Sequence, residues 1–272
     1  MSRPSMHNAG FSLPQATRTV MWLIGANVAL YVVQLILLRT PAAPVITEGL
    51  YLTPSHVYRQ GFVWQLFTYG WFHDPMAPTH LLFNMLWLYL FGPEMDRWWG
   101  SRRFLRAYFI FITAGGVLTV LASLFFEAVG LNLTFPIVPH LGASGGTLGI
   151  TMAWGLVHSN RQLNLLLVGP MTGRTFVLLL VGFQILVALS FSNTSATAHF
   201  GGLTAAFILC RGLWRPSRWK DLFEKQRLRM KKRRIEKELD TLQKGGTPRE
   251  PPPGWKVIDG GGAPPDDPKK WN

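Results

Sequence analysis

Long apolar stretches alternate with shorter polar connections along the chain, and this pattern predicts membrane-spanning helices. The stretches cover residues 20–38, 79–92, 104–126, 142–157, 176–191 and 196–213. Each is too apolar and too poor in charge for the surface of a soluble helix, so we expect an all-α, multi-pass membrane protein with six transmembrane helices. The fourth stretch is short for a bilayer crossing of ~20 residues, so one of its ends should lie below the membrane surface.

The segments outside these stretches divide the chain further. Residues 39–78 mix aromatic residues with Pro and Gly, which predicts a structured loop at the membrane interface. Residues 214–244 alternate charged and apolar positions at helical spacing, and we expect a basic amphipathic helix on the cytoplasmic side. Residues 245–272 are rich in Pro, Gly and charge, which is typical of disorder. With a polar cytoplasmic segment at 1–19, the membrane core becomes 20–213.

Composition and charge support this assignment. The chain is 48% hydrophobic and only 15% charged, and between Arg106 and Arg211 its only charged residues are Glu127, Arg161 and Arg174. The formal net charge is +13, and 17 of the 27 Lys and Arg residues lie from Arg211 onward. Basic charge beside a membrane favours binding to anionic lipid and argues against a nucleic-acid partner. The Arg-bearing connections follow the second, fourth and sixth stretches, so both termini should be cytoplasmic.

A serine among glycines opens the fourth stretch, in the sequence Gly142-Ala143-Ser144-Gly145-Gly146. A hydroxyl at the first turn of a helix lies among unpaired N–H groups and the positive end of the helix dipole, which suits a nucleophile that generates an oxyanion. The alternative is close packing between membrane helices, for which Gly and Ser are common. The pattern also fits G-x-S-x-G, but the surrounding charge-free stretches exclude a soluble α/β hydrolase.

His199 is the candidate base for this serine. It begins the sixth stretch, and in the predicted topology it lies on the outer side, as Ser144 does. Small residues, including Gly142, Gly145 and Gly202, would let the two helices pack closely enough for Ser144 and His199 to hydrogen-bond. We expect no carboxylate at that depth, so the residues allow a Ser–His dyad. An interhelical hydrogen bond is the alternative role for His199.

His80 and Asn84 form a second polar pair, in the second stretch. Their i, i+4 spacing places them on one helix face. If that face points toward Ser144, they can donate hydrogen bonds to an oxyanion alongside the Ser144 backbone N–H, each donor contributing ~3 kcal/mol. Polar contacts between helices are the alternative role for this pair.

Taken together, these motifs resemble the rhomboid family of intramembrane serine proteases. The resemblance rests on His80-Leu-Leu-Phe-Asn84, Gly142-Ala-Ser144-Gly145 and Ala198-His199-Phe-Gly-Gly202, and extends from about Val20 to Leu213. It implies a six-helix bundle in which Ser144 is the nucleophile and His199 the general base. It also implies that His80, Asn84 and the Ser144 N–H form the oxyanion hole, that no metal or cofactor is needed, and that transmembrane segments of other proteins are the substrates.

The sequence departs from the family pattern at several positions. Leu148 stands where an aromatic residue often stacks on the histidine, Gln65 follows Trp64 where arginine is usual, and Ala206 replaces a second glycine after Gly202. We therefore expect an intramembrane serine endopeptidase, with a non-proteolytic rhomboid-like binder of membrane helices as the alternative. A transporter is disfavoured because the polar residues lie toward one face of the membrane. A bacterial inner membrane is the expected location.

Overall fold

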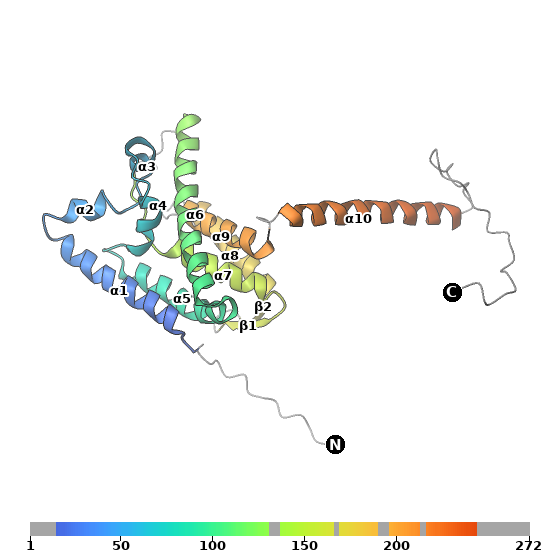
Figure 1. The fold of residues 1–272 in the computed structure, drawn as a ribbon, viewed down its shortest axis with the longest axis horizontal. Coiled ribbons are helices and arrows are strands. Elements are labelled where there is room, and N and C mark those ends of the chain that lie inside the picture. Colours follow the sequence, from blue (N-terminus) through green and yellow to red (C-terminus); the bar gives the residue numbers. More distant parts are fainter. Residues whose placement is uncertain (1–14, 131–136, 166–168, 190–195, 213–215, 244–272) are drawn as a thin grey trace, which may run out of the picture. The chain divides into compact units, whose positions relative to one another are not determined.

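The computed structural model describes residues 15–130, 137–165, 169–189, 196–212 and 216–243 (Figure 1). The chain divides into two units, residues 1–214 and residues 215–272. The first unit contains every residue that the motifs single out. The segment 245–272, predicted to be disordered, lies outside the described residues.

Each of the six predicted stretches overlaps one helix of the described residues. The helices are α1 (Arg18–Leu37), α5 (Pro78–Trp99), α6 (Ser101–Ala128), α7 (Ser144–Val157), α8 (Gly173–Leu189) and α9 (Ala196–Arg211). The main difference is at α5, which continues beyond the predicted end through Pro93 and stops only before Gly100, whose φ is +77°. Proline usually interrupts a helix, but Gly92 and Pro93 are buried here, and Gly92 packs against Val20 and Phe104.

Two of the described helices, α1 and α6, are long and apolar enough to cross a membrane, and α8 is a shorter apolar helix. Large hydrophobic side chains on these helices point outward. Trp22 on α1 is 78% exposed and Leu178 on α8 is 73% exposed. Apolar surface of this extent on several helices is typical of a protein that contacts lipid.

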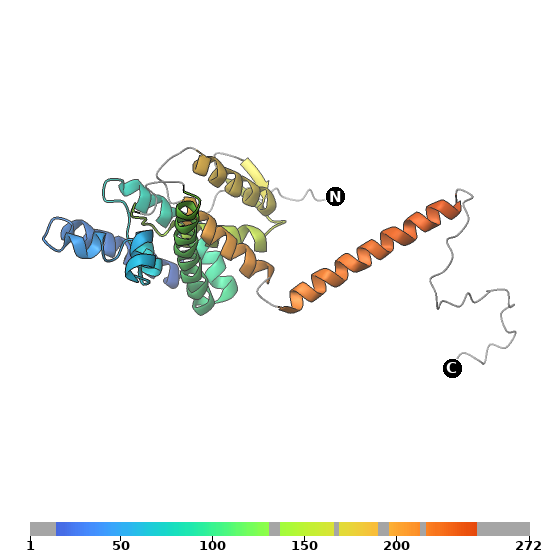
Figure 2. The ribbon, with the colours of Figure 1, turned by 90° about the horizontal axis from the view of Figure 1, so that it is seen from above.

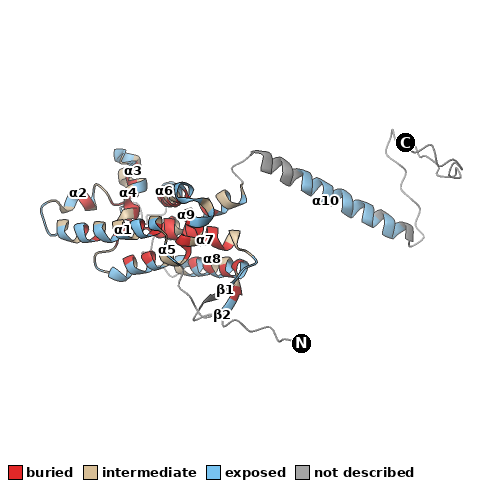
Figure 3. Ribbon diagram, turned by 60° about the horizontal axis from the view of Figure 1, so that its bottom comes forward, coloured by how far each residue is buried: buried red, intermediate tan, exposed pale blue. Residues whose placement is uncertain are grey.

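Helix α7 lies at the centre of the first unit, where it packs against α5, α6, α8 and α9. All its residues from Ser144 to Gly155 are buried, as the red segment in Figure 3 shows. Its glycines make this possible: an added Cβ at Gly146 would lie 2.8 Å from Ile112 and Tyr108, and one at Gly149 would lie 2.4 Å from Phe111. Small residues therefore allow α6 to approach the α7 backbone.

The loop between α1 and α5 is structured, in agreement with the sequence analysis. It contains α2 (Ala43–Thr47), α3 (Pro54–Gln60), α4 (Gln65–Thr68) and the 3₁₀ helix η1 (Tyr69–Trp71). Gln34 of α1 donates to the His73 carbonyl at 2.7 Å and accepts from the His73 N–H at 3.2 Å. At the other side of the loop, Tyr58 and Arg59 both bind the Glu127 carboxylate near the end of α6. The loop is thus anchored to two long helices, through His73 to α1 and through Tyr58 and Arg59 to α6.

The described part of the chain is all-α in class, as expected, with one small addition: a β-hairpin between α7 and α8. Strand β1 (Gln162–Leu165) pairs antiparallel with β2 (Gly169–Thr172). The hydrophobic pattern of this segment does not predict strands, because each strand has only four residues and a period-2 alternation is hard to recognise in so short a run. Helix α8 contacts β2, and the two lie at one edge of the unit (Figure 2).

The second unit contains helix α10 (Pro216–Gln243), within the segment predicted to be a basic amphipathic helix. Its described side chains, from Glu224 to Thr241, are exposed, including Leu228 and Ile235. Lys232 and Glu236 form an i, i+4 ion pair at 3.6 Å. The helix thus presents both charged and apolar side chains to its surroundings.

Candidate active site

The backbone segment just before Ser144 is held by the first loop. His140 and Leu52 exchange two backbone hydrogen bonds, of 3.0 and 2.7 Å. The Gly142 N–H donates to the Tyr69 carbonyl at 3.1 Å. The Ala143 N–H then donates to Nε2 of His73 at 3.5 Å. The loop therefore sets the path by which the chain reaches the serine.

His73 accepts this bond because its imidazole is neutral. Its side chain is fully buried. Desolvation by burial, together with the nearby His80, lowers the pKa of His73 to about 3, so the ring carries no charge at neutral pH. A protonated ring could not accept the Ala143 N–H, so the bond requires this environment.

Ser144 is the first residue of α7 and is only 8% exposed. The first N–H groups of a helix have no intrahelical acceptor, so the Ser144 amide is available as a donor beside the hydroxyl. Gly142, with φ of +128°, keeps the space in front of the serine clear. A Cβ at this position would lie 2.8 Å from both Cε1 and Nε2 of the His80 ring and 3.6 Å from Ser144 Oγ.

His199 comes close to this serine because α9 crosses α7 at a contact between glycines. A Cβ on Gly202 would lie 2.0 Å from the Gly145 carbonyl oxygen, so the two backbones are nearly in contact. Gly145 in turn approaches the Ala198 carbonyl, next to His199. The predicted packing residues Gly145 and Gly202 thus lie at one helix crossing, whereas Gly142 borders His80.

His80 and Asn84 reach the site from α5. The Asp74 N–H donates to Nδ1 of His80 at 3.5 Å, which leaves the ring proton of neutral His80 on Nε2, the nitrogen near Gly142. The Asn84 side chain donates to the His80 carbonyl at 2.9 Å and accepts from Thr147 of α7 at 3.1 Å. Thr147 was not predicted, although it is one helical turn from Ser144.

These residues share one cavity, of about 460 Å³. Its lining includes His80, Asn84, Ser144, Leu148, Gln184 and His199, with Asp74, Thr79, Phe83, Trp87, Pro139 and Leu141 around them. A cavity of this size in which polar groups converge beside apolar side chains is typical of a ligand or substrate site. Four helices (α5, α7, α8 and α9), the first loop and the segment before α7 therefore contribute to one site.

Asp74 corrects the expectation that no carboxylate lies at this depth. It belongs to the first loop, for which the sequence predicts only an interfacial segment, and the fold brings this part of the loop to the cavity. Its Oδ1 accepts the Met76 N–H and its backbone contacts His80 and Tyr31. In the described part of the chain, no group of three or more His, Cys, Asp or Glu side chains is arranged to hold a metal.

Ser144 and His199 differ from the expected direct pair. No hydrogen bond joins these two described residues; Nδ1 of His199 instead lies 2.8 Å from Oε1 of Gln184 on α8. Hydrogen bonds between catalytic groups are often long before substrate binds, so both residues remain in one site. Gln184 was not singled out, although its position in the apolar stretch of α8 was the available signal.

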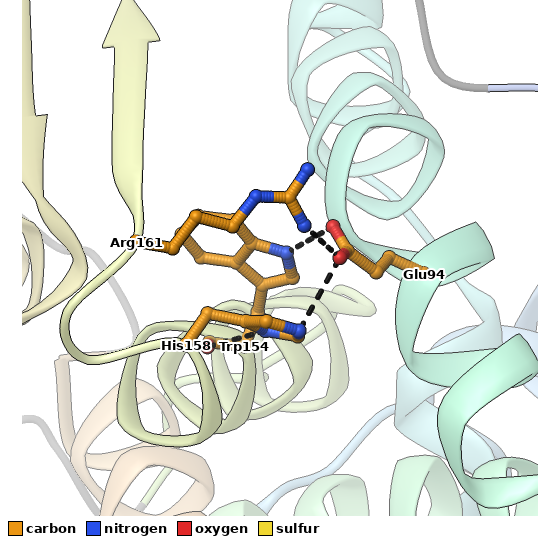
Figure 4. A network of polar contacts seen from close by, with 4 residues as sticks. All are labelled: Glu94, Trp154, His158 and Arg161. Atoms are coloured by element: carbon orange, nitrogen blue, oxygen red, sulfur yellow. Dashed lines mark hydrogen bonds and ion pairs between the residues drawn. The ribbon is translucent and has the colours of Figure 1, made fainter.

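A second polar cluster lies at the opposite end of α7 (Figure 4). The indole N–H of Trp154 donates to Glu94 of α5 at 2.7 Å, and Arg161 and His158 pair with the same carboxylate. Trp154 is only 3% exposed, so Glu94 satisfies a buried donor. This cluster joins α5 to α7 and does not line the cavity.

Comparison with known proteins identifies the chain's relatives. Residues 60–216 match the family model of the Rhomboid domain. "Putative rhomboid protease YdcA" of Bacillus subtilis (strain 168) is 30% identical over 132 residues, 48% of this chain and 58% of that protein. "Rhomboid protease GluP" of the same organism is 29% identical over 195 residues, 70% of this chain and 34% of that protein.

A plant relative also matches. "RHOMBOID-like protein 12, mitochondrial" of Arabidopsis thaliana is 28% identical over 158 residues, 56% of this chain and 46% of that protein. The matches span from about a third to less than two thirds of the length of these three relatives. The Rhomboid domain model, in contrast, covers more than half of this chain. With its apolar helices and this domain match, the chain is an integral membrane protein that belongs to the rhomboid family.

Proposed function

We propose that this chain is an intramembrane serine endopeptidase that cleaves transmembrane segments of other membrane proteins. The observation that carries the proposal is the meeting of Ser144 from α7, His199 from α9 and the pair His80 and Asn84 from α5 in one cavity. Serine and histidine supply a nucleophile and a base, and the α5 pair supplies donors for an oxyanion. Two of the relatives are named as rhomboid proteases, and one of these as putative.

The proposed reaction proceeds through an acyl-enzyme. His199 takes the proton from the Ser144 hydroxyl as the oxygen attacks the scissile carbonyl carbon. The tetrahedral intermediate collapses when His199 gives that proton to the leaving amine, and the C–N bond breaks. A water molecule, deprotonated by His199, then attacks the ester carbon; the bond between this carbon and Ser144 Oγ breaks, and His199 returns the proton to Oγ.

The oxyanion would be stabilised by donors from two helices. His80 carries its ring proton on Nε2 because Nδ1 accepts from Asp74. Asn84 uses one side-chain N–H on the His80 carbonyl and retains a second. The Ser144 N–H at the start of α7 is the third donor. Removal of one such donor costs about 10²- to 10³-fold in kcat.

The proposed membrane arrangement follows from the helices and the charges. Helix α7 has 14 residues and is about 21 Å long at 1.5 Å per residue, shorter than a bilayer core of ~30 Å. Ser144 would therefore lie below the outer surface, where a cavity can admit water. We infer six transmembrane helices (α1, α5, α6, α7, α8 and α9), cytoplasmic termini and, in bacteria, a location in the cell membrane.

Labelling with a fluorophosphonate tests the proposal without knowledge of a natural substrate. The purified wild-type chain in detergent should become covalently labelled, with the adduct on Ser144 by peptide mass spectrometry. Ser144→Ala and His199→Ala should abolish labelling, while Ser123→Ala, which removes a buried serine of α6 away from the cavity, should retain it. Labelling that persists in Ser144→Ala would refute the assignment of the nucleophile.

A non-proteolytic binder of membrane helices is the alternative function, and one observation favours it. Leu148 is buried and lines the cavity where the family often has an aromatic ring, so His199 lacks that stacking partner. A binder of this kind would retain client helices and show neither labelling nor cleavage. The same labelling experiment therefore distinguishes the two functions.

We further propose that α10 binds the surface of anionic lipid. Its sequence from Lys225 to Lys237 contains eight basic residues and one acidic residue, and its described side chains are exposed. Each Lys or Arg near an anionic surface contributes about 1 kcal/mol. In nanodiscs, amide hydrogen exchange in α10 should slow when phosphatidylglycerol replaces part of the phosphatidylcholine; equal rates in both lipids would contradict this.

A further inference from the structure

Helix α8 carries a buried glutamine whose position the dyad mechanism does not explain. Gln184 interrupts the apolar run from Phe176 to Leu189 and is only 5% exposed. A buried amide without a partner costs about 1–3 kcal/mol, so such a residue is expected to serve a specific contact. Here that contact is with His199, whose Nδ1 lies 2.8 Å from Gln184 Oε1.

We propose that Gln184 is a positioning residue for the base: its side-chain oxygen holds His199 in the Nδ1–H tautomer, with Nε2 left to take the proton of Ser144. The inference rests on the proposed protease function. An amide oxygen only accepts hydrogen bonds, so the bond requires a proton on Nδ1. In the neutral ring, the basic lone pair is then on Nε2.

The role resembles that of the acid in a catalytic triad, but without its charge. A triad carboxylate both orients the imidazole and stabilises the imidazolium, whereas a neutral amide supplies mainly the orientation. The charged and titratable groups near His199 come from other elements. Among the described residues that line the cavity they are His80 on α5 and Asp74 in the first loop, and Asp74 contacts His80 through its backbone.

The side chain of Leu148 gives a reason for a positioning residue on α8. It lies on α7 one turn after Ser144, lines the cavity and is aliphatic, so it offers the His199 ring no aromatic face. Among the described residues, Gln184 makes the hydrogen bond that restricts rotation of this ring. The orientation of the base therefore depends on α8 more than on α7.

The test compares Gln184→Met and Gln184→Glu with Leu180→Met as the matched control. Methionine keeps the length of the side chain but cannot accept the bond with comparable strength. Leu180 lies one turn away on α8, is 7% exposed and is absent from the cavity lining. Each variant is assayed for kcat and KM on one transmembrane substrate across pH, and its thermal unfolding is recorded.

We expect Gln184→Met to lower kcat by about 10- to 100-fold, part of the contribution of a general base, with KM and the unfolding temperature near those of Leu180→Met. Gln184→Glu should recover activity relative to Gln184→Met. It should also move the acidic limb of the pH–rate profile to higher pH, because a carboxylate stabilises the imidazolium. A glutamine that only supported the packing of α8 would give neither a loss of kcat beyond that of Leu180→Met at equal stability nor recovery of activity by glutamate.

Three results would overturn the proposal. These are a Gln184→Met kcat equal to that of Leu180→Met, an unmoved pH profile in a folded Gln184→Glu protein, or a Gln184→Glu activity below that of Gln184→Met. The last result is expected if the amide donates to Nδ1 instead. Fluorophosphonate labelling of wild type separates the two proposals, since a wild type that labels on Ser144 upholds the protease function even where the role of Gln184 fails.

Discussion

Alanine at position 202 would place a methyl group inside the contact between α7 and α9. The added Cβ would lie 2.0 Å from the Gly145 carbonyl oxygen and 2.8 Å from its carbon. Ordinary contacts begin at 3.4 Å, so the oxygen contact is short by about 1.4 Å. The obstacle is backbone and cannot rotate away, so the two helices must move apart.

The expected change in the free energy of unfolding follows from comparison with a second glycine, Gly182. An added Cβ at Gly182 on α8 meets no atom within 4 Å, so Gly182→Ala gains helix propensity, about 1 kcal/mol, without a clash. Gly202→Ala has the same gain but adds overpacking, which costs about 1–3 kcal/mol. The free energy of unfolding should therefore differ between the two variants by about 1–3 kcal/mol, with Gly202→Ala the less stable.

The same shift should disturb the site, because Gly145 follows Ser144 and Gly202 lies three residues after His199. A displacement of about 1 Å between catalytic groups can cost 10²-fold in rate. The assay is thermal unfolding in detergent together with the rate of fluorophosphonate labelling. If Gly202→Ala unfolds at the temperature of Gly182→Ala and is labelled as fast, then α7 and α9 do not cross as closely as described.

Two further predictions concern stability. Glu94→Ala should lower the free energy of unfolding by about 2 kcal/mol because it leaves the buried Trp154 N–H without its acceptor. Glu94→Gln should cost about half as much. Equal losses for the two variants in chemical denaturation would contradict this. Folding lowers the pKa of His73 from 6.5 to about 3, so between these pH values the unfolded chain binds a proton that the folded chain does not. The free energy of unfolding should therefore drop by up to about 1.4 kcal/mol per pH unit as the pH falls below 6.5. His73→Gln should flatten this dependence in unfolding measured from pH 7 to pH 4, and an unchanged slope would show that other groups cause it.

The helices were predictable because hydrophobic runs report burial or lipid contact directly. The run 104–126 falls within α6, and the run 142–157 begins two residues before α7. The end of α5 was not predictable, because Gly92-Pro93 usually stops a helix and only packing against α1 and α6 explains its continuation. The hairpin between α7 and α8 was missed because strands of four residues leave too short a pattern.

The site was only partly predictable, for a related reason. Ser144, His199, His80 and Asn84 lie in motifs that can be recognised along the chain. Gln184 and Asp74 belong to the cavity only because α8 and the first loop are folded against it. A polar residue inside an apolar stretch is the one local signal, and it applies to Gln184 but not to Asp74.

Ser144 and His199 are proposed to cut a peptide bond together, and the decisive measurement is cleavage of an unstable transmembrane substrate by the purified chain in detergent. Wild type should cleave the substrate, and Ser144→Ala and His199→Ala should each abolish cleavage while unfolding at the wild-type temperature. Cleavage that survives in folded Ser144→Ala would contradict the mechanism.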